Sequence, residues 1–142
     1  MTLYRLSTIL ALPVLVAAAL RRGGREEAAE RLGLRGGPGP VLWLHGASNG
    51  EIGAARWLVE LLVERWPGMR FLITANNPTA RTMVERWGLA RVEARLAPFD
   101  DPATVRRFLR RWRPLALLTL ENELWPGRLD GCAAGSAVGH RL

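Results

Sequence analysis

The sequence contains no lysine, a single cysteine and two histidines, and each scarcity excludes a class of site. Without lysine there is no Walker A loop, because that motif needs a lysine to reach the nucleotide phosphates. Cys132 alone cannot form an internal disulfide or a metal site built from several thiolates. His45 and His140 lie far apart in the chain, which argues against a histidine metal cluster.

The residues that are present describe one basic, folded domain. The chain has 142 residues, enough for one ordinary domain, and 49% of them are hydrophobic, enough for a real core. Its net charge is +7, all of its basic residues that are charged at pH 7 are arginines, and its pI is near 11.4. Such a charge favours anionic partners such as membrane surfaces or phosphorylated lipids. We expect no nucleic-acid partner, since the sequence has no recognition helix or aromatic-basic stacking face.

The amino-terminal stretch is apolar enough to contact a membrane. Leu3 to Leu20 is 18 residues long with four polar side chains, just sufficient for a membrane span. One arginine, Arg5, lies near the amino end of this stretch and three follow it closely, which favours a cytoplasmic downstream domain. We therefore predict an anchor helix over residues 1–22 that either spans the bilayer or lies in its interface. A cleaved signal peptide and a buried core helix are the alternatives.

Residues 23–40 are expected to form a short charged helix, Arg25 to Leu34, and a glycine- and proline-rich linker. Beyond the linker, apolar strands alternate with helix-patterned segments. The predicted strands are 41–44, 71–74, 92–96 and 115–120, and the predicted helices are 52–66, 79–87 and 102–112. The residues expected on the buried face of the first helix are Ile52, Ala55, Val59, Leu62, Val63 and Trp66. The fold class is α/β, a Rossmann-like parallel sheet with helices on both faces, preceded by a hydrophobic anchor helix.

Three loops follow strand ends at the edge where ligands usually bind, and the first carries Glu51 at the start of a helix. The loops are 45–51, 75–78 and 121–125. The sequence from Ser48 to Glu51 also fits a capping box, in which the serine caps the helix and the glutamate bonds back to it. Local sequence does not decide whether Glu51 is a capping residue, a residue of a ligand or active site, or both. Glu121 and Glu123 follow the fourth strand and are the second carboxylates of a candidate site.

Other motifs are weaker. Residues 46–50 fit the G-x-S-x-G nucleophile elbow of α/β-hydrolases. The only downstream histidine, His140, has no predicted strand before it to position it, and no earlier core strand carries an oxyanion loop. The loop also lacks the G-x-G-x-x-G spacing of a dinucleotide site. A hydrolase is therefore only a remote alternative.

The loops resemble a known family. Residues 45–51 resemble the H-x-x-S-x-G-E signature of the bacterial 3-deoxy-D-manno-octulosonic acid (Kdo) transferases, and residues 121–126 their E-T-E-L-W-P motif, with Asn122 in place of threonine. Residues 74–79 are a looser version of their T-x-T-x-T-G loop. The resemblance covers roughly residues 3–129, so residues 41–129 are expected to form the amino-terminal, acceptor-binding domain of a GT-B glycosyltransferase.

The resemblance implies an inverting, metal-independent enzyme of lipopolysaccharide biosynthesis that transfers Kdo from CMP-Kdo to a lipid A precursor. It implies no cofactor beyond that donor, and it places the enzyme at the cytoplasmic face of the inner membrane. By position, Glu51 corresponds to the general base and Glu121 to the residue that stabilises the transition state. The expected substrate contacts are Ser48, Asn49, Gly50, Asn76, Asn77 and Glu123. The arginines of the last helix are expected to form a solvated face or to contact lipid phosphates: Arg106, Arg107, Arg110, Arg111 and Arg113.

The tail departs from the family pattern. Residues 130–142 are rich in glycine and alanine and have no regular periodicity, so no further strand is predicted there. A donor domain is missing from this sequence, and we expect the chain alone not to transfer Kdo. It would then act with a separately encoded donor half, or serve as a non-catalytic acceptor-, lipid- or partner-binding domain.

Overall fold

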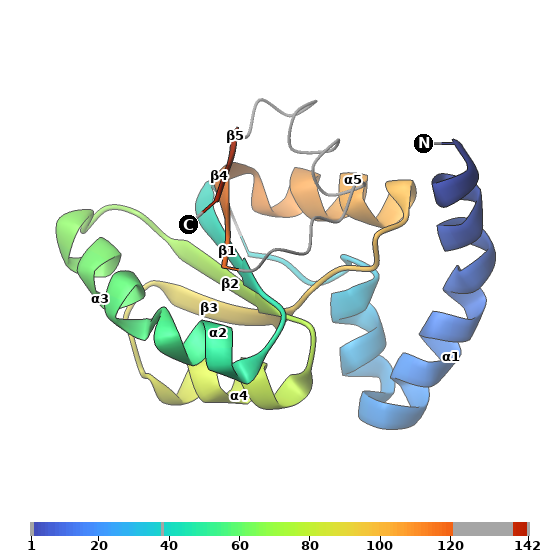
Figure 1. Cartoon of the computed structure of the whole chain (residues 1–142), viewed down its shortest axis with the longest axis horizontal. Coiled ribbons are helices and arrows are strands. Elements are labelled where there is room, and N and C mark those ends of the chain that lie inside the picture. Colours follow the sequence, from blue (N-terminus) through green and yellow to red (C-terminus); the bar gives the residue numbers. More distant parts are fainter. Residues whose placement is uncertain (1, 38, 121–137, 142) are drawn as a thin grey trace.

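The computed structural model describes residues 2–37, 39–120 and 138–141, which form a bent helical arm beside an α/β domain (Figure 1). The elements in chain order are α1 (Thr2–Arg31), β1 (Val41–Gly46), α2 (Asn49–Ala54), α3 (Arg56–Arg65), β2 (Phe71–Ala75), α4 (Pro78–Arg86), β3 (Val92–Leu96), α5 (Pro102–Trp112), β4 (Pro114–Thr119) and β5 (Val138–Arg141).

The strands form one parallel sheet in the order β3-β2-β1-β4-β5. The chain builds outward from β1 to β3 and then crosses back to place β4 on the other side of β1. The carboxyl ends of β1 and β4 are therefore the switch point of the sheet, where open α/β folds bind their ligands. The predicted α/β class and parallel sheet are confirmed.

Alternation along the strands gives the sheet two apolar faces, and helices cover both (Figure 1). On one face, Leu44 and Ile73 pack with Ile52 of α2, Val59 of α3 and Val84 of α4. On the other face, the aromatic side chains of β1 and α5 form the core: the ring centroids of Trp43 and Phe108 are 4.7 Å apart, and Trp112 packs beside them. This double cover is why the strands read as continuous apolar runs.

Three helices begin at polar caps on the carboxyl side of the sheet. Ser48 caps α2, Asn77 caps α4 and Asp101 caps α5, each accepting a hydrogen bond from a backbone N–H of the first turn. Pro78 and Pro102 follow their caps directly, at positions where a helix needs no N–H donor. The capping box predicted from Ser48 to Glu51 and the cap at Asp101 are confirmed.

α1 is bent at Gly24 (φ 66°, ψ −155°) into a first arm, residues 2–23, and a second arm, residues 25–31. The second arm docks on the strand ends through charged groups. Arg31 donates to the carbonyls of Asn76, after β2, at 2.5 Å and of Ala97, after β3, at 3.5 Å. Glu30 accepts a 2.7 Å bond from the Leu96 N–H. The arm thus fills hydrogen-bonding positions that the strands leave open where they end.

Local details differ from expectation in three places. The helix expected over 52–66 is two helices that meet at Ala55, and Trp66 is 47% exposed because it follows the end of α3 with non-helical angles. The charged helix expected over 25–34 ends at Arg31 and continues the anchor helix across the bend at Gly24. The expectation of no strand near His140 is wrong, because backbone pairing with β4 makes Val138–Arg141 a strand.

Asn76 and Asn77 form a matched pair for testing the caps. Asn77→Ala should lower the free energy of unfolding by about 1 kcal/mol, because its Oδ1 caps α4 through the Ala80 N–H at 2.8 Å. Asn76→Ala should change stability by less than about 0.5 kcal/mol, because Arg31 binds its backbone carbonyl. Urea unfolding of the detergent-solubilised chain, followed by tryptophan fluorescence, measures both. Equal losses would contradict these assignments.

Arg31 should be needed for the folded state. Arg31→Met removes the more buried of the two arginines that pair with Glu27, whose side chain is 3% exposed and lies 3.6 Å from the Arg31 Nε. The other arginine, Arg22, is 60% exposed and compensates the carboxylate less, so the change should cost about 3 kcal/mol. Adding Glu27→Gln should recover part of that loss, because the buried carboxylate charge is then removed. The same urea titration measures both variants. A double variant no more stable than Arg31→Met would contradict the pairing.

Candidate active site

The predicted site loops leave neighbouring strands at one edge of the sheet. Gly46 pairs with Ala75 in the register of β1 and β2, so residues 47–51 and 76–77 start side by side. On the other side of β1, the Leu120 N–H donates to the His45 carbonyl at 2.8 Å. The chain therefore reaches residue 120 against the end of β1. Glu121 and Glu123 lie outside the described residues.

Glu51 is held by the turn from β1 into α2. Its Oε2 accepts hydrogen bonds from the backbone N–H groups of Ala47 and Ser48, each at 3.1 Å. Ser48 Oγ in turn accepts from the Glu51 N–H at 3.2 Å. These bonds fix the orientation of the carboxylate. Within the described part of the chain, the other carboxylate oxygen, Oε1, accepts no hydrogen bond, and the Glu51 side chain is only half-buried.

The turn needs a glycine at position 46. A Cβ on Gly46 would lie 2.4 Å from Cγ1 of Ile52, the buried residue that follows Glu51. No side chain fits in that space, so α2 packs directly on the end of β1. This close approach sets how near Glu51 lies to the strand ends.

Asn49 and Gly50 are the remaining predicted contacts of this loop, and both lie in the first turn of α2. Gly50 is exposed in the first turn of the helix. Asn49 is half-buried and lines an open hollow of about 820 Å³ between α2 and α4, with Arg56, Thr82, Arg86 and Trp87 among the other lining residues. Asn49 is therefore separated from Asn76, which lines a different hollow at the ends of β2 and β3.

That second hollow, of about 330 Å³, lies between α1 and the ends of β2 and β3. Asn76 lines it, whereas the Asn77 side chain is occupied by its cap. Arg22 and Arg31 supply positive charge, and Asp100 and Asp101 negative charge. Asp101 is 3% exposed, and its Oδ2 has no hydrogen-bond partner among the described residues. The lining can therefore bind both donors and acceptors of a polar ligand.

Sequence reasoning missed the second arm of α1 as part of this edge. Burial lowers the pKa of Arg31 from its usual range, and the nearby Glu27 carboxylate raises it in part. Glu30 receives Arg81 at 2.9 Å as well as the Leu96 N–H. The i, i+4 spacing of Glu27 and Arg31 was the available signal for one pair. The contacts with β2, β3 and α4 have no local signature.

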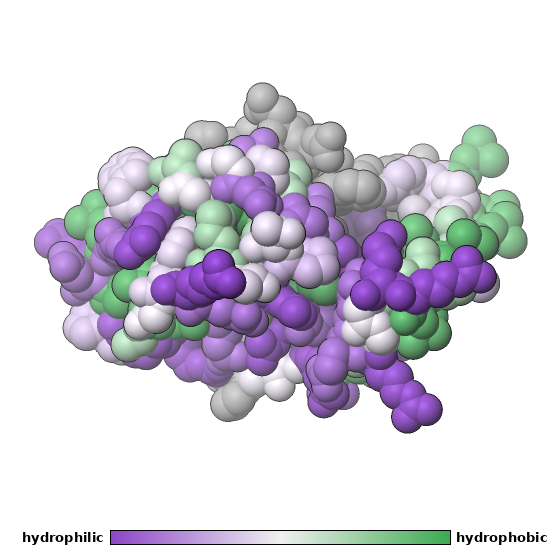
Figure 2. Space-filling view, turned by 90° about the horizontal axis from the view of Figure 1, so that it is seen from below, coloured by the Kyte–Doolittle hydropathy of each residue, from purple (hydrophilic) through white to green (hydrophobic). Residues whose placement is uncertain are grey.

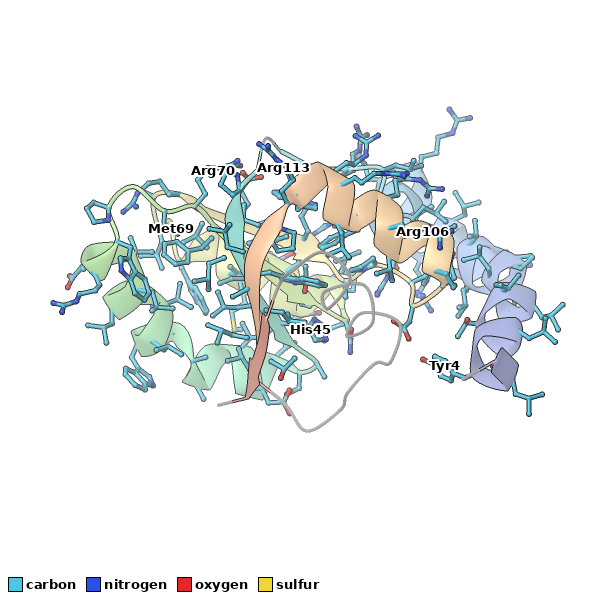
Figure 3. All side chains as sticks on the ribbon, turned by 90° about the horizontal axis from the view of Figure 1, so that it is seen from above. Tyr4, His45, Met69, Arg70, Arg106 and Arg113 are labelled. Atoms are coloured by element: carbon cyan, nitrogen blue, oxygen red, sulfur yellow. The ribbon has the colours of Figure 1, made fainter. Side chains whose placement is uncertain are left out.

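The structure gives no support to the nucleophile elbow. Ser48 Oγ serves as the helix cap, and His45 lies in β1 with its Nδ1 2.9 Å from Thr74 Oγ1 (Figure 3). Thr74 Oγ1 also accepts the indole N–H of Trp43 at 2.8 Å, so this imidazole belongs to a buried network beneath the loops. Among the described residues, no group of three or more His, Cys, Asp or Glu side chains is placed to hold a metal ion.

The arginines of α5 divide into two groups. Arg106, Arg110, Arg111 and Arg113 are exposed, as expected of a solvated face (Figure 3). Arg107 is not part of that face: it is half-buried and donates to the carbonyl of Leu32 at 2.5 Å. Its role is to hold the segment after α1 against α5.

Comparison with known proteins gives a consistent result. A model of the family described as 3-deoxy-D-manno-octulosonic-acid transferase (kdotransferase) matches residues 26–137. The 3-deoxy-D-manno-octulosonic acid transferase of Bordetella pertussis is 36% identical over 128 residues, which cover 82% of this chain and 29% of that protein. The transferase of the same name from Rickettsia felis is 36% identical over 87 residues, or 61% of this chain and 18% of that protein.

A probable mitochondrial transferase of Arabidopsis thaliana is 34% identical over 89 residues, or 63% of this chain and 20% of that protein. The chain thus spans less than a third of the length of these relatives. Because the family match covers most of the chain, including the loops after β1 and β2, the chain belongs to the Kdo transferase family and corresponds to its amino-terminal domain.

Proposed function

We propose that this domain is the acceptor-binding half of an inverting, metal-independent glycosyltransferase that moves Kdo from CMP-Kdo to a lipid A precursor. The observation that carries the proposal is the placement of Glu51. Its carboxylate is fixed at the switch point of the sheet, in a loop that resembles the family signature, with Oε1 left without a hydrogen bond in the described structure.

The capping box and a catalytic role are compatible in this geometry. The two N–H groups bind Oε2 and leave Oε1 to accept the proton of an acceptor hydroxyl. As that proton leaves, the hydroxyl oxygen forms a bond to the anomeric carbon of Kdo, and the bond from that carbon to the CMP phosphate breaks. CMP departs with the electron pair from the opposite face, which inverts the configuration. In this proposal, Glu121 stabilises the positive charge that develops on the sugar.

The acceptor and the membrane fit the remaining features of the chain. The net charge of +7 suits a phosphorylated lipid. Within the described residues, one helix is long and apolar enough to cross a membrane, namely Leu6–Arg31, which contains an 18-residue stretch with a mean hydropathy of 1.5. We therefore place the domain at the cytoplasmic face of the bacterial inner membrane, anchored by α1.

Glu51→Gln tests the base. In the chain joined to the carboxyl-terminal domain of a relative, this variant should lose at least about 100-fold in transfer rate, because an amide cannot take the proton. Its fold should be intact, since the amide oxygen still accepts the two N–H bonds. Val59→Ala in α3 is the stability control: it removes buried apolar contacts, costs about 2 kcal/mol of stability and leaves Glu51 and its loop unchanged. Near-normal transfer by Glu51→Gln would reduce Glu51 to a capping residue.

The chain alone should not transfer Kdo. It spans 29% of the Bordetella relative, and a GT-B enzyme holds its nucleotide sugar in the carboxyl-terminal domain. Incubating the purified chain with CMP-Kdo and lipid A precursor should give no product, whereas the joined protein should give product under the same conditions. Turnover by the chain alone would refute the proposal that transfer needs the carboxyl-terminal domain. Precursor binding without turnover would support an acceptor-binding domain.

A further inference from the structure

The first arm of α1 is long enough either to cross a bilayer or to lie along it. Its residues 2–23 form about 33 Å of helix at 1.5 Å per residue, close to the roughly 30 Å of a hydrocarbon core. Length and composition therefore do not decide the orientation. The contacts of the arm with the domain do.

The first arm contacts the domain near both of its ends, with the 330 Å³ hollow between the two contacts. Near its start, the Tyr4 hydroxyl donates to Asp100 Oδ2 at 2.5 Å, and Figure 3 shows this side chain pointing towards the domain. Thr8 and Leu15 line the 330 Å³ hollow from the helix side, and Ala19 is fully buried. These residues recur every three or four positions or multiples of them, so they form a single helical stripe.

The opposite stripe is apolar and uncovered. Leu3, Leu6, Leu10 and Val14 are 84%, 56%, 72% and 70% exposed, and they share the helix face that points away from the domain. Figure 2 shows hydrophobic surface gathered over α1 at that end of the molecule. Contiguous apolar surface of this kind marks a contact with lipid or with another protein.

A spanning helix is incompatible with these contacts. From Tyr4 to Arg22, a helix crossing the bilayer would separate its ends by about 27 Å along the membrane normal. In the structure Tyr4 contacts Asp100, while Arg22 Nε lies 3.6 Å from Glu27 Oε1 in the second arm, which itself docks on the strand ends. Both ends of the arm are thus tied to one polar domain that cannot enter hydrocarbon.

We propose that the first arm of α1 lies in the plane of the membrane interface, tied to the domain at Asp100, with its Leu3–Val14 stripe facing lipid. An ordinary interfacial helix turns its polar face to water, whereas this arm turns the face that carries Tyr4 and Thr8 to the domain. Arg21, Arg22 and Arg25 are exposed at the bend, where their charges attract anionic lipid. The inference rests on the membrane association proposed above and not on the transfer chemistry.

Cysteine labelling in cells tests the orientation. In a Cys132→Ser background, single cysteines replace Ser7, which is exposed and is not part of the lipid-facing stripe, and, as a domain control, the exposed Arg113. An impermeant maleimide should label neither site in intact spheroplasts and both in inside-out membrane vesicles, because an in-plane arm keeps Ser7 on the side of the domain. Labelling of Ser7→Cys from outside, with Arg113→Cys protected, would establish a spanning helix and overturn the proposal.

A second experiment tests the tie at Asp100. In the same background, Thr8→Cys with Phe99→Cys, which line the hollow from the arm and from the domain and leave Tyr4 and Asp100 intact, should be joined by a short bis-maleimide on vesicles of phosphatidylethanolamine and phosphatidylglycerol. Leu10→Cys with Phe99→Cys is the control and should not be joined, because Leu10 lies on the opposite face. Joining of neither pair, with the chain still bound to vesicles, would show that the arm leaves the domain and would overturn the proposal. A chain that does not bind the vesicles would overturn the membrane association itself.

Discussion

The arrangement of this protein depends on the charged contacts that join the second arm of α1 to the ends of β2 and β3. Arg31 binds two carbonyls just beyond those strands, and Glu30 binds the last backbone N–H of β3. Parallel strands leave such groups unpaired where they end, and burying them without partners costs free energy. Supplying these partners from α1 fixes a hydrophobic helix beside the edge of the sheet that carries Glu51. The proposed lipid contact and the proposed chemistry are thereby placed at the same edge of the domain.

Glu51 has a structural role that leaves one of its carboxylate oxygens available for the proposed chemistry. Its Oε2 completes a capping box, and its Oε1 is unengaged in the described structure. A side chain held in this way needs no reorganisation when a substrate arrives, which is the advantage of a preorganised site. The local sequence does not distinguish capping from the proposed catalytic role, and in the structure the cap occupies only Oε2.

The sequence was most informative where structure is local. The caps at Ser48 and Asp101 follow from residue type and spacing, and the buried strands follow from apolar runs covered on both faces. Reasoning failed where distant segments meet. Arg31 reaches residues 45 and 66 positions away, and Arg107 reaches a carbonyl 75 positions away. Helical periodicity places Trp66 on the buried face, but α3 ends at Arg65 and Trp66 follows it with non-helical angles.

Gly46 limits how this loop can vary in related or engineered enzymes. Because a Cβ there would collide with Ile52, any larger residue must push α2 outward, and Glu51 moves with the helix. Substitution at an exposed position of the turn, such as Gly50, leaves this packing unchanged, whereas substitution of the residue that ends the strand does not. The absence of a side chain at position 46 therefore fixes the distance between Glu51 and the end of the strand.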